Sequence, residues 1–250
     1  MEAINSFFDW LFGFFEKPSI NKTNTSSKST KTSQTNVPNP SSKVNPRNSS
    51  MLVMGHSGNV GAGNWSEVLG TKYNMKVINI AIGGKQSADD LKALKQYFFV
   101  QPKSPDIVFI HSGLNDMWSG KTIAQVAKNQ QSAIDLVRSK GAKRVYLVLG
   151  YDGMKVNRGV GTAGFARGTT QQMIEDYKQR FSNYQKQVPP LIRNATIVPV
   201  ETTIERKKLP NSNSYSKELV YDGLHLTSKG HKIFADHIDR NIFSSQGVQP

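Results

Sequence analysis

Cysteine is absent from this 250-residue chain, and acidic residues are scarce beside basic ones. Without cysteine, the protein can form neither a disulfide framework nor a thiolate metal site. Hydrophobic residues make up 37% of the chain, which is low for a protein that is folded throughout. Part of the chain is therefore expected to be unfolded.

The charge is strongly one-sided, with 32 Lys and Arg against 18 Asp and Glu and a formal net charge of +14. This balance predicts attraction to a polyanion such as nucleic acid, anionic lipid or an acidic cell-wall polymer, and it equally suits a lysine-rich soluble surface. The basic residues are scattered, with no run of five or more and no interleaved aromatic residues. We therefore expect no nucleic-acid partner.

Residues 1–16 form an amphipathic segment whose apolar side chains recur at helical spacing, as Phe7, Leu11 and Phe15 illustrate. The start lacks lysine and arginine and no small-residue cleavage site follows, so it does not fit a classical signal peptide. It is also shorter than the roughly 20 apolar residues that span a bilayer. We expect a helix that docks on a partner protein, with membrane-surface binding and packing onto its own domain as alternatives.

Residues 17–50 consist almost entirely of Ser, Thr, Asn, Lys and Pro. Such a segment cannot bury enough apolar surface to offset its conformational entropy, so it is predicted to be a disordered tether. The folded domain is then expected to cover residues 51–250.

Within that domain, short apolar strand signals alternate with helical stretches. This alternation predicts a three-layer α/β/α fold with a five-stranded, mostly parallel sheet buried on both faces. The expected strands are Met51–Met54, Lys76–Ile82, Asp106–His111, Arg144–Leu149 and Thr196–Val200. The expected helices lie near residues 86–99, 121–140, 170–187 and 227–242.

Ligands of open α/β sheets bind beyond the carboxyl ends of the strands, and there the chain places polar and glycine-rich segments. They are Gly55-His56-Ser57-Gly58, Asn79-Ile80-Ala81-Ile82-Gly83-Gly84, Gly113-Leu114-Asn115-Asp116 and, before the last helix, Asp222-Gly223-Leu224-His225. A serine activated by an imidazole, a carboxylate that orients the imidazole, and amide donors for an oxyanion are the parts of an acyl-transfer site.

These four segments closely resemble the sequence blocks of the SGNH (GDSL-like) hydrolase family. Gly55-His56-Ser57 looks like the nucleophile block, and Asn79-x-Ala81-x-x-Gly84 looks like the second. Gly113-x-Asn115-Asp116 matches the third block and Asp222-x-x-His225 the last.

The resemblance implies a catalytic set of Ser57 as nucleophile, His225 as general base and Asp222 as its orienting acid. The implied oxyanion hole uses the backbone N–H groups of Ser57 and Gly84 and the side-chain amide of Asn115. It implies no metal and no organic cofactor.

Other polar and aromatic residues near these segments leave alternatives open. His56 stands where the family usually has aspartate, and it either contacts substrate, tunes the site or is a tolerated substitution. His111 and Trp118 are further possible substrate contacts, with structural roles as the alternative. His231 and His237 lie six residues apart on the last helix, which is not a one-face ligand spacing, so they are interpreted as surface or packing residues.

Taken together, these features predict a serine esterase that works through an acyl-serine intermediate. The favoured substrate is O-acetylated cell-wall or other surface polysaccharide, and the anchor–tether–enzyme order suits a bacteriophage virion enzyme. One alternative is a lipid-directed esterase or lysophospholipase anchored by residues 1–16. Another is a non-catalytic structural or binding protein that retains the fold.

Overall fold

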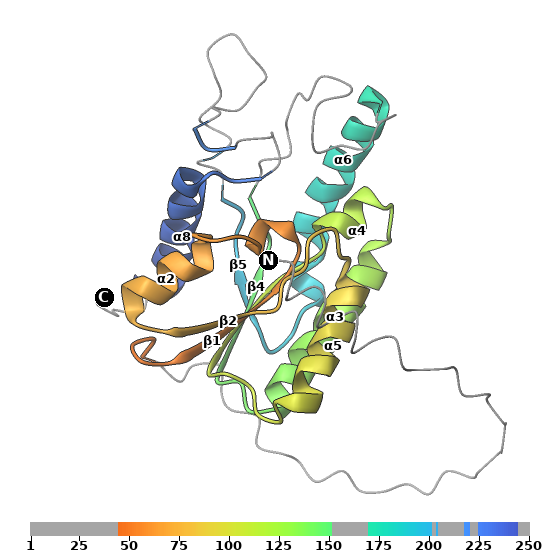
Figure 1. The fold of residues 1–250 in the computed structure, drawn as a ribbon. Helices are drawn as coiled ribbons and strands as arrows, with labels where there is room; N and C mark the ends of the chain where they lie inside the picture. The colour runs from red at the N-terminus through yellow and green to blue at the C-terminus, as the bar shows by residue number, and fades with distance from the viewer. Residues whose placement is uncertain (1–44, 152–169, 202–203, 205–217, 221–224, 245–250) are drawn as a thin grey trace, which may run out of the picture. The chain divides into compact units, whose positions relative to one another are not determined.

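The computed structural model describes residues 45–151, 170–201, 204, 218–220 and 225–244, drawn in colour in Figure 1. The predicted docking helix at residues 1–16 and most of the predicted tether at 17–50 lie outside these residues. Five strands form one sheet: β1 Ser50–Gly55, β2 Lys76–Asn79, β3 Ile107–His111, β4 Arg144–Val148 and β5 Thr196–Val198.

The strands lie in the order β2-β1-β3-β4-β5, and each pair of neighbours is parallel. In the central register, Leu52 pairs with Val108, which in turn pairs with Val145. This is the strand order of the flavodoxin-like doubly wound fold, so the predicted fold class is confirmed. The chain reverses its direction of winding between β1 and β3, and such a switch point is where these sheets bind ligands.

Helices cover both faces of the sheet (Figure 1). Helices α2 Trp65–Tyr73 and α8 Ser228–Ile242 lie on one face, and α3 Ser87–Val100, α5 Ile123–Ser139 and α6 Gln171–Gln187 lie on the other. Successive side chains of β1 alternate between the two cores: Met51 and Val53 pack toward α2 and α8, and Leu52 and Met54 toward α3 and α5. A strand that is buried on both faces explains why its sequence is continuously apolar.

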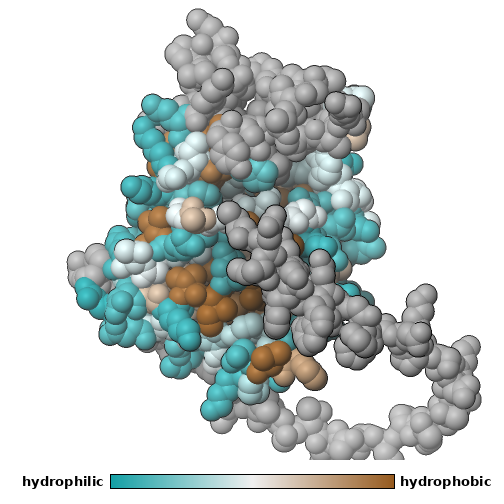
Figure 2. All heavy atoms as spheres, viewed as in Figure 1, coloured by the Kyte–Doolittle hydropathy of each residue, from teal (hydrophilic) through white to brown (hydrophobic). Residues whose placement is uncertain are grey.

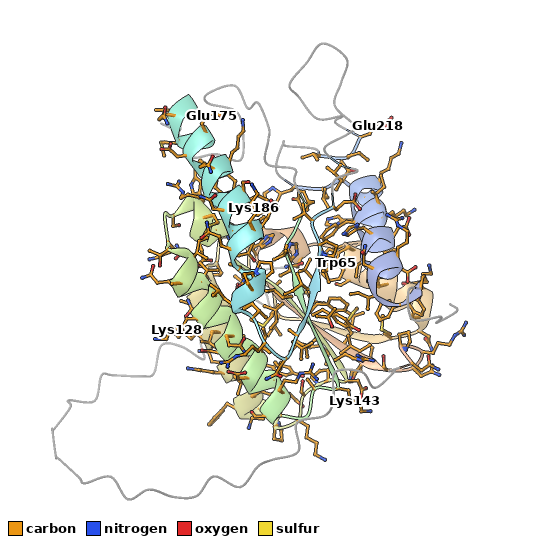
Figure 3. The ribbon with its side chains drawn as sticks, turned by 180° about the vertical axis from the view of Figure 1, so that it is seen from behind. Trp65, Lys128, Lys143, Glu175, Lys186 and Glu218 are labelled. Carbon is orange, nitrogen blue, oxygen red and sulfur yellow. The ribbon has the colours of Figure 1, made fainter. Side chains whose placement is uncertain are left out.

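The four predicted helices are present, but α2 and the short α4 Leu114–Trp118 were not predicted. Helix α2 follows a glycine-rich stretch, and its start is marked by Asn64, whose side chain accepts hydrogen bonds from the N–H groups of Ser66 and Glu67. Trp65 anchors this helix, with its ring centroid 5.3 Å from Phe109 and 5.9 Å from Phe234. Figure 3 shows Trp65 inside the molecule, between the sheet and α8.

Four strands are shorter than predicted, β3 and β4 by one residue each and β2 and β5 by more, and local chemistry explains the two larger differences. β2 ends at Asn79, whose side chain accepts from the N–H of Ala81 and donates to the carbonyl of Asn59. β5 ends at Val198, directly before Pro199, which has no N–H for a sheet hydrogen bond. The end of β2 therefore turns toward the loop that follows β1.

The described surface is largely hydrophilic, interrupted by hydrophobic patches on the face shown in Figure 2. Among the described residues, no helix is both long and apolar enough to cross a membrane.

Candidate active site

Ser57 lies at the carboxyl end of β1, on the first residue of a short 3-10 helix, Ser57–Asn59. The turn before it needs a glycine, because Gly55 has a φ of +135° and a Cβ there would lie 1.8 Å from the carbonyl oxygen of His111. This close approach ties the end of β1 to the end of β3. Ser57 itself is half-buried, so its hydroxyl group stands at the edge of the sheet.

The structure brings Ser57 and His225 together across 168 residues: Nε2 of His225 lies 2.9 Å from Oγ of Ser57. Next to His225, Leu226 pairs with Val220, and the N–H of Thr227 donates to the carbonyl of Leu219. Thr227 then caps α8 by accepting a hydrogen bond from the N–H of Gly230. These contacts place an imidazole within proton-transfer distance of the serine hydroxyl.

Asp222, the predicted orienting carboxylate, lies outside the described residues. Its assignment remains a prediction from the sequence pattern.

The predicted oxyanion-hole residues lie on three segments that contact one another: the turn after β1, the loop after β2 and α4. The loop after β2 lies against the nucleophile, because a Cβ on Gly83 would stand 3.8 Å from Cβ of Ser57. Gly84 has a φ of +74° and is exposed. Asn115, in α4, donates from Nδ2 to the carbonyl of Lys85 at 2.7 Å. Within the described residues, no hydrogen bond uses the N–H of Ser57 or of Gly84.

Asp116, which follows Asn115, connects α4 to the start of α3. Asp116 is buried and accepts hydrogen bonds from both the N–H and the hydroxyl of Ser87, at 2.8 and 2.6 Å. Since Ser87 begins α3, these bonds connect the start of α3 to α4. The Gly113-x-Asn115-Asp116 segment thus holds the loop that carries Gly84, a contact that the sequence pattern did not predict.

His56 and His111 lie beneath Ser57 and are buried, at 3% and 0% exposure. Nδ1 of His56 accepts a hydrogen bond from the N–H of Gly58, and His56 thereby caps the 3-10 helix that carries the nucleophile. Nδ1 of His111 lies 2.8 Å from Oδ1 of Asn59, which also accepts the indole N–H of Trp65. Neither histidine reaches the surface, so the predicted substrate contacts of His56 and His111 do not agree with their positions.

Replacing His56 tests whether this cap positions the nucleophile. His56→Ala removes the acceptor for the N–H of Gly58, so we expect a loss of about 1–2 kcal/mol in the free energy of unfolding. Because the shifted turn carries Ser57, we also expect kcat to fall by about tenfold or more. His56→Asn supplies another capping oxygen and should recover most of the lost kcat. If urea unfolding and ester kinetics show the two variants equally impaired, the cap is not what matters at this position.

A hollow of about 400 Å³ opens beside Ser57 and His225. It is lined by Ser57, Gly58, Val60, Gly61, Ala62, His225, Leu226, Thr227, Ser228 and His231. Trp118 is not among these residues; its ring packs 5.5 Å from that of Tyr177. His231, interpreted from the sequence as a surface or packing residue, is therefore a pocket residue that the spacing of histidines did not reveal.

The buried histidines lead to a prediction about acid stability. Burial, reinforced by the charge of His225, lowers the pKa of His56 from 6.5 to about 3 and that of His231 to about 4. Burial also lowers the pKa of His111 well below 6.5. Each stays neutral in the folded protein and takes up a proton on unfolding below pH 6.5, so each makes stability fall as the pH falls.

One carboxyl group has the opposite effect on how stability depends on pH. Burial, with the charges of Asp116 and Asp89, raises the pKa of Asp90 from 3.8 to about 8, so unfolding releases its proton between these values. With three histidines against one aspartate, unfolding near pH 5 should take up about two protons, or roughly 3 kcal/mol of stability per pH unit. Urea titrations at pH 6 and 5 measure this slope, and Asp90→Asn should steepen it. A wild-type midpoint that rises on acidification would contradict the prediction.

Among the described residues, no group of three or more His, Asp or Glu side chains is placed to hold a metal ion. A serine and a histidine in hydrogen-bond contact at the carboxyl edge of a doubly wound sheet define the serine hydrolase class. The chain belongs to the GDSL-like lipase/acylhydrolase family, whose model matches residues 47–233. It is thus a carboxylic ester hydrolase of the SGNH type.

Solved structures of similar fold include enzymes from several bacteria. A catalytic mutant of Axe2, an acetylxylan esterase from Geobacillus stearothermophilus, is 16% identical with a TM-score of 0.57, over 78% of this chain and 94% of that one. The psychrotrophic esterase EstA from Pseudoalteromonas is 17% identical with a TM-score of 0.53, over 80% and 100%.

A GDSL-like lipase from Bacteroides thetaiotaomicron is 17% identical with a TM-score of 0.51, over 79% of this chain and 89% of that one. At 16–17% sequence identity, the structural similarity establishes the fold alone. Comparison with curated proteins found no matching sequence.

Proposed function

We propose that Ser57 is the nucleophile of this ester hydrolase, with His225 as general base and Asp222 as the residue that orients His225. The observation that carries the proposal is the 2.9 Å distance between Nε2 of His225 and Oγ of Ser57. A serine hydroxyl is a weak nucleophile until a base within this distance accepts its proton.

The chemistry follows from that geometry in two halves. Nε2 of His225 takes the Ser57 proton as Oγ bonds to the ester carbonyl carbon, and the carbonyl oxygen becomes an oxyanion. The tetrahedral intermediate collapses as the protonated His225 gives its proton to the leaving alcohol, which leaves an acyl-serine. His225 then takes a proton from water, whose oxygen attacks the acyl carbon, and returns the proton to Ser57 as the carboxylic acid departs.

The oxyanion that forms in this mechanism needs hydrogen-bond donors near the ester carbonyl oxygen. The N–H groups of Ser57 and Gly84 and the amide of Asn115 are the three proposed donors. Asn115 already gives one Nδ2 hydrogen to the carbonyl of Lys85, which fixes the amide plane and leaves the second hydrogen for the oxyanion. Donors held in this way pay no reorganisation cost when the negative charge develops.

We further propose that the substrate is an O-acetylated polysaccharide of a cell wall or another surface. The polar residues of the pocket, which include Thr227, Ser228 and His231, suit a hydroxyl-rich substrate better than a lipid chain. The net charge of +14 favours an anionic polymer, and a protein of similar fold is an acetylxylan esterase. The order predicted from the sequence, a docking helix, a tether and an enzyme, suits attachment to a larger particle such as a bacteriophage virion.

Acetate release is the measurement that tests this proposal. Purified protein is incubated with p-nitrophenyl acetate, with O-acetylated peptidoglycan and with p-nitrophenyl esters of longer acids, and Ser57→Ala provides the background rate. Ser57-dependent release from both acetyl substrates, falling with acyl length, supports polysaccharide deacetylation. Faster turnover of long acyl esters would instead favour the lipid-directed alternative, and no turnover of any ester by folded protein would contradict the catalytic roles.

A further inference from the structure

The pocket beside Ser57 has two walls that come from distant parts of the chain. One wall is formed by Val60, Gly61 and Ala62, which follow the nucleophile turn, and the other by residues 225–228 and His231, which lead into the first turn of α8. Its volume of about 400 Å³ is within the range of small-molecule sites. Of the described residues, neither Gly84 nor Asn115 lines it.

The position of His225 decides which half of an ester this pocket receives. The imidazole that accepts the proton of Ser57 must afterwards deliver it to the leaving oxygen. That oxygen therefore has to come within hydrogen-bond distance of Nε2 of His225. A pocket with His225 in its wall consequently holds the leaving alcohol rather than the acyl group.

His231 supplies a polar group in this alcohol pocket. The residue is buried, with 9% of its surface exposed, and Nδ1 is buried without a hydrogen-bond partner among the described residues. His231 lines the pocket, and no hydrogen bond from a described residue engages its Nε2. A neutral imidazole can accept from a hydroxyl group through one nitrogen or donate to it through the other.

The backbone around His231 is held in place, so the ring is presented at a defined position. The N–H of His231 donates to the carbonyl of Thr227 at 2.8 Å, and Thr227 caps the helix. A Cβ on Gly230 would lie 2.3 Å from the carbonyl oxygen of Leu219, so only glycine permits this packing. Lys229 forms a 2.7 Å ion pair with Glu218, which Figure 3 shows beside the N-terminal end of α8.

We propose that His231 hydrogen-bonds a hydroxyl of the leaving alcohol and so makes the enzyme prefer esters of sugars to esters of simple alcohols. This rests on the proposed roles of Ser57 and His225. Because the pKa of His231 is lowered to about 4 by burial and by the charge of His225, the ring is neutral near pH 7 and binds uncharged hydroxyl groups.

Two acetyl esters that differ only in the alcohol test the inference: p-nitrophenyl acetate and a methyl glucopyranoside carrying one O-acetyl group. For His231→Leu we expect kcat/KM on the sugar acetate to fall by about tenfold, mainly through KM, because one neutral hydrogen bond is lost. Activity on p-nitrophenyl acetate should stay within about twofold, since that leaving group has no hydroxyl to bind. His231→Gln, which keeps a hydrogen-bonding group, should recover part of the loss.

The matched control is Lys232→Leu, an exposed neighbour on α8 that does not line the pocket, and both kcat/KM values should be unchanged. Free methyl glucopyranoside gives a second readout: it should inhibit hydrolysis of p-nitrophenyl acetate less in His231→Leu than in wild type. An equal loss on both esters in His231→Leu, or unchanged inhibition, would overturn the inference. So would wild-type protein that hydrolyses only p-nitrophenyl acetate, although the catalytic roles would then stand. Wild-type protein inactive on both esters would overturn the proposed function itself.

Discussion

Replacing Ser57 with alanine is expected to lower kcat for acetyl esters by about 10⁴-fold or more, because no other group can form the acyl intermediate. Ser57 is half-buried, and the one hydrogen bond of its hydroxyl group among the described residues is to His225, so the folded state should be little affected. Release of p-nitrophenol from p-nitrophenyl acetate, followed under saturating substrate, measures the effect.

Two controls make the result specific to the proposed mechanism. The urea midpoint of Ser57→Ala should match that of wild type, which excludes unfolding as the cause. Mass spectrometry of wild-type protein after treatment with an organophosphonate ester should show one added phosphonyl group on Ser57, and the variant should show none. Retention of more than about a hundredth of the wild-type kcat would rule out Ser57 as the nucleophile.

The second large effect is expected at Asn115. Asn115→Ala should lower kcat by about 10²–10³-fold with little change in KM, because an oxyanion donor acts on the transition state and not on the bound ester. Steady-state kinetics on p-nitrophenyl acetate separate kcat from KM directly.

Loop displacement is the competing explanation, because Asn115 also donates to the carbonyl of Lys85. Gln86→Ala is the matched control: Nε2 of Gln86 donates to Oγ of Ser119 at 2.9 Å, which ties the same loop to the end of α4 without offering an oxyanion donor. Its kcat should stay within about threefold of wild type, since one exposed hydrogen bond contributes little. A loss in Gln86→Ala as large as that in Asn115→Ala would show that Asn115 acts by holding the loop.

The type of fold could be predicted from local sequence patterns, whereas the catalytic pair was implied by the resemblance of four segments to the SGNH sequence blocks. Strands such as β3 are continuously apolar because both of their faces are covered, and this property depends on composition and length rather than on distant contacts. Ser57 and His225 were recognisable because the segments around them, Gly55-His56-Ser57 and Asp222-x-x-His225, resemble blocks of the SGNH family. The parallel sheet places Ser57 at the carboxyl edge, while His225 reaches it from the segment before α8, a contact across 168 residues that the fold provides.

Helix α2 shows where local patterns were not enough. Its apolar residues, among them Trp65 and Tyr73, are few, and a glycine-rich stretch precedes the helix. Its stability comes from packing against α8 and the sheet, which a window of local sequence does not contain.

By itself, the sequence determined the parallel fold and the order of the polar segments, because these depend on periodicity and on residue chemistry, and its resemblance to the SGNH family implied the catalytic residues. Only the tertiary structure decided that His56 and His111 turn inward under the nucleophile while His231 faces the pocket. The physical reason is that the direction of a side chain at a turn depends on backbone angles and on close packing with distant elements. The contact between Gly55 and β3 and that between Gly230 and Leu219 are two such cases.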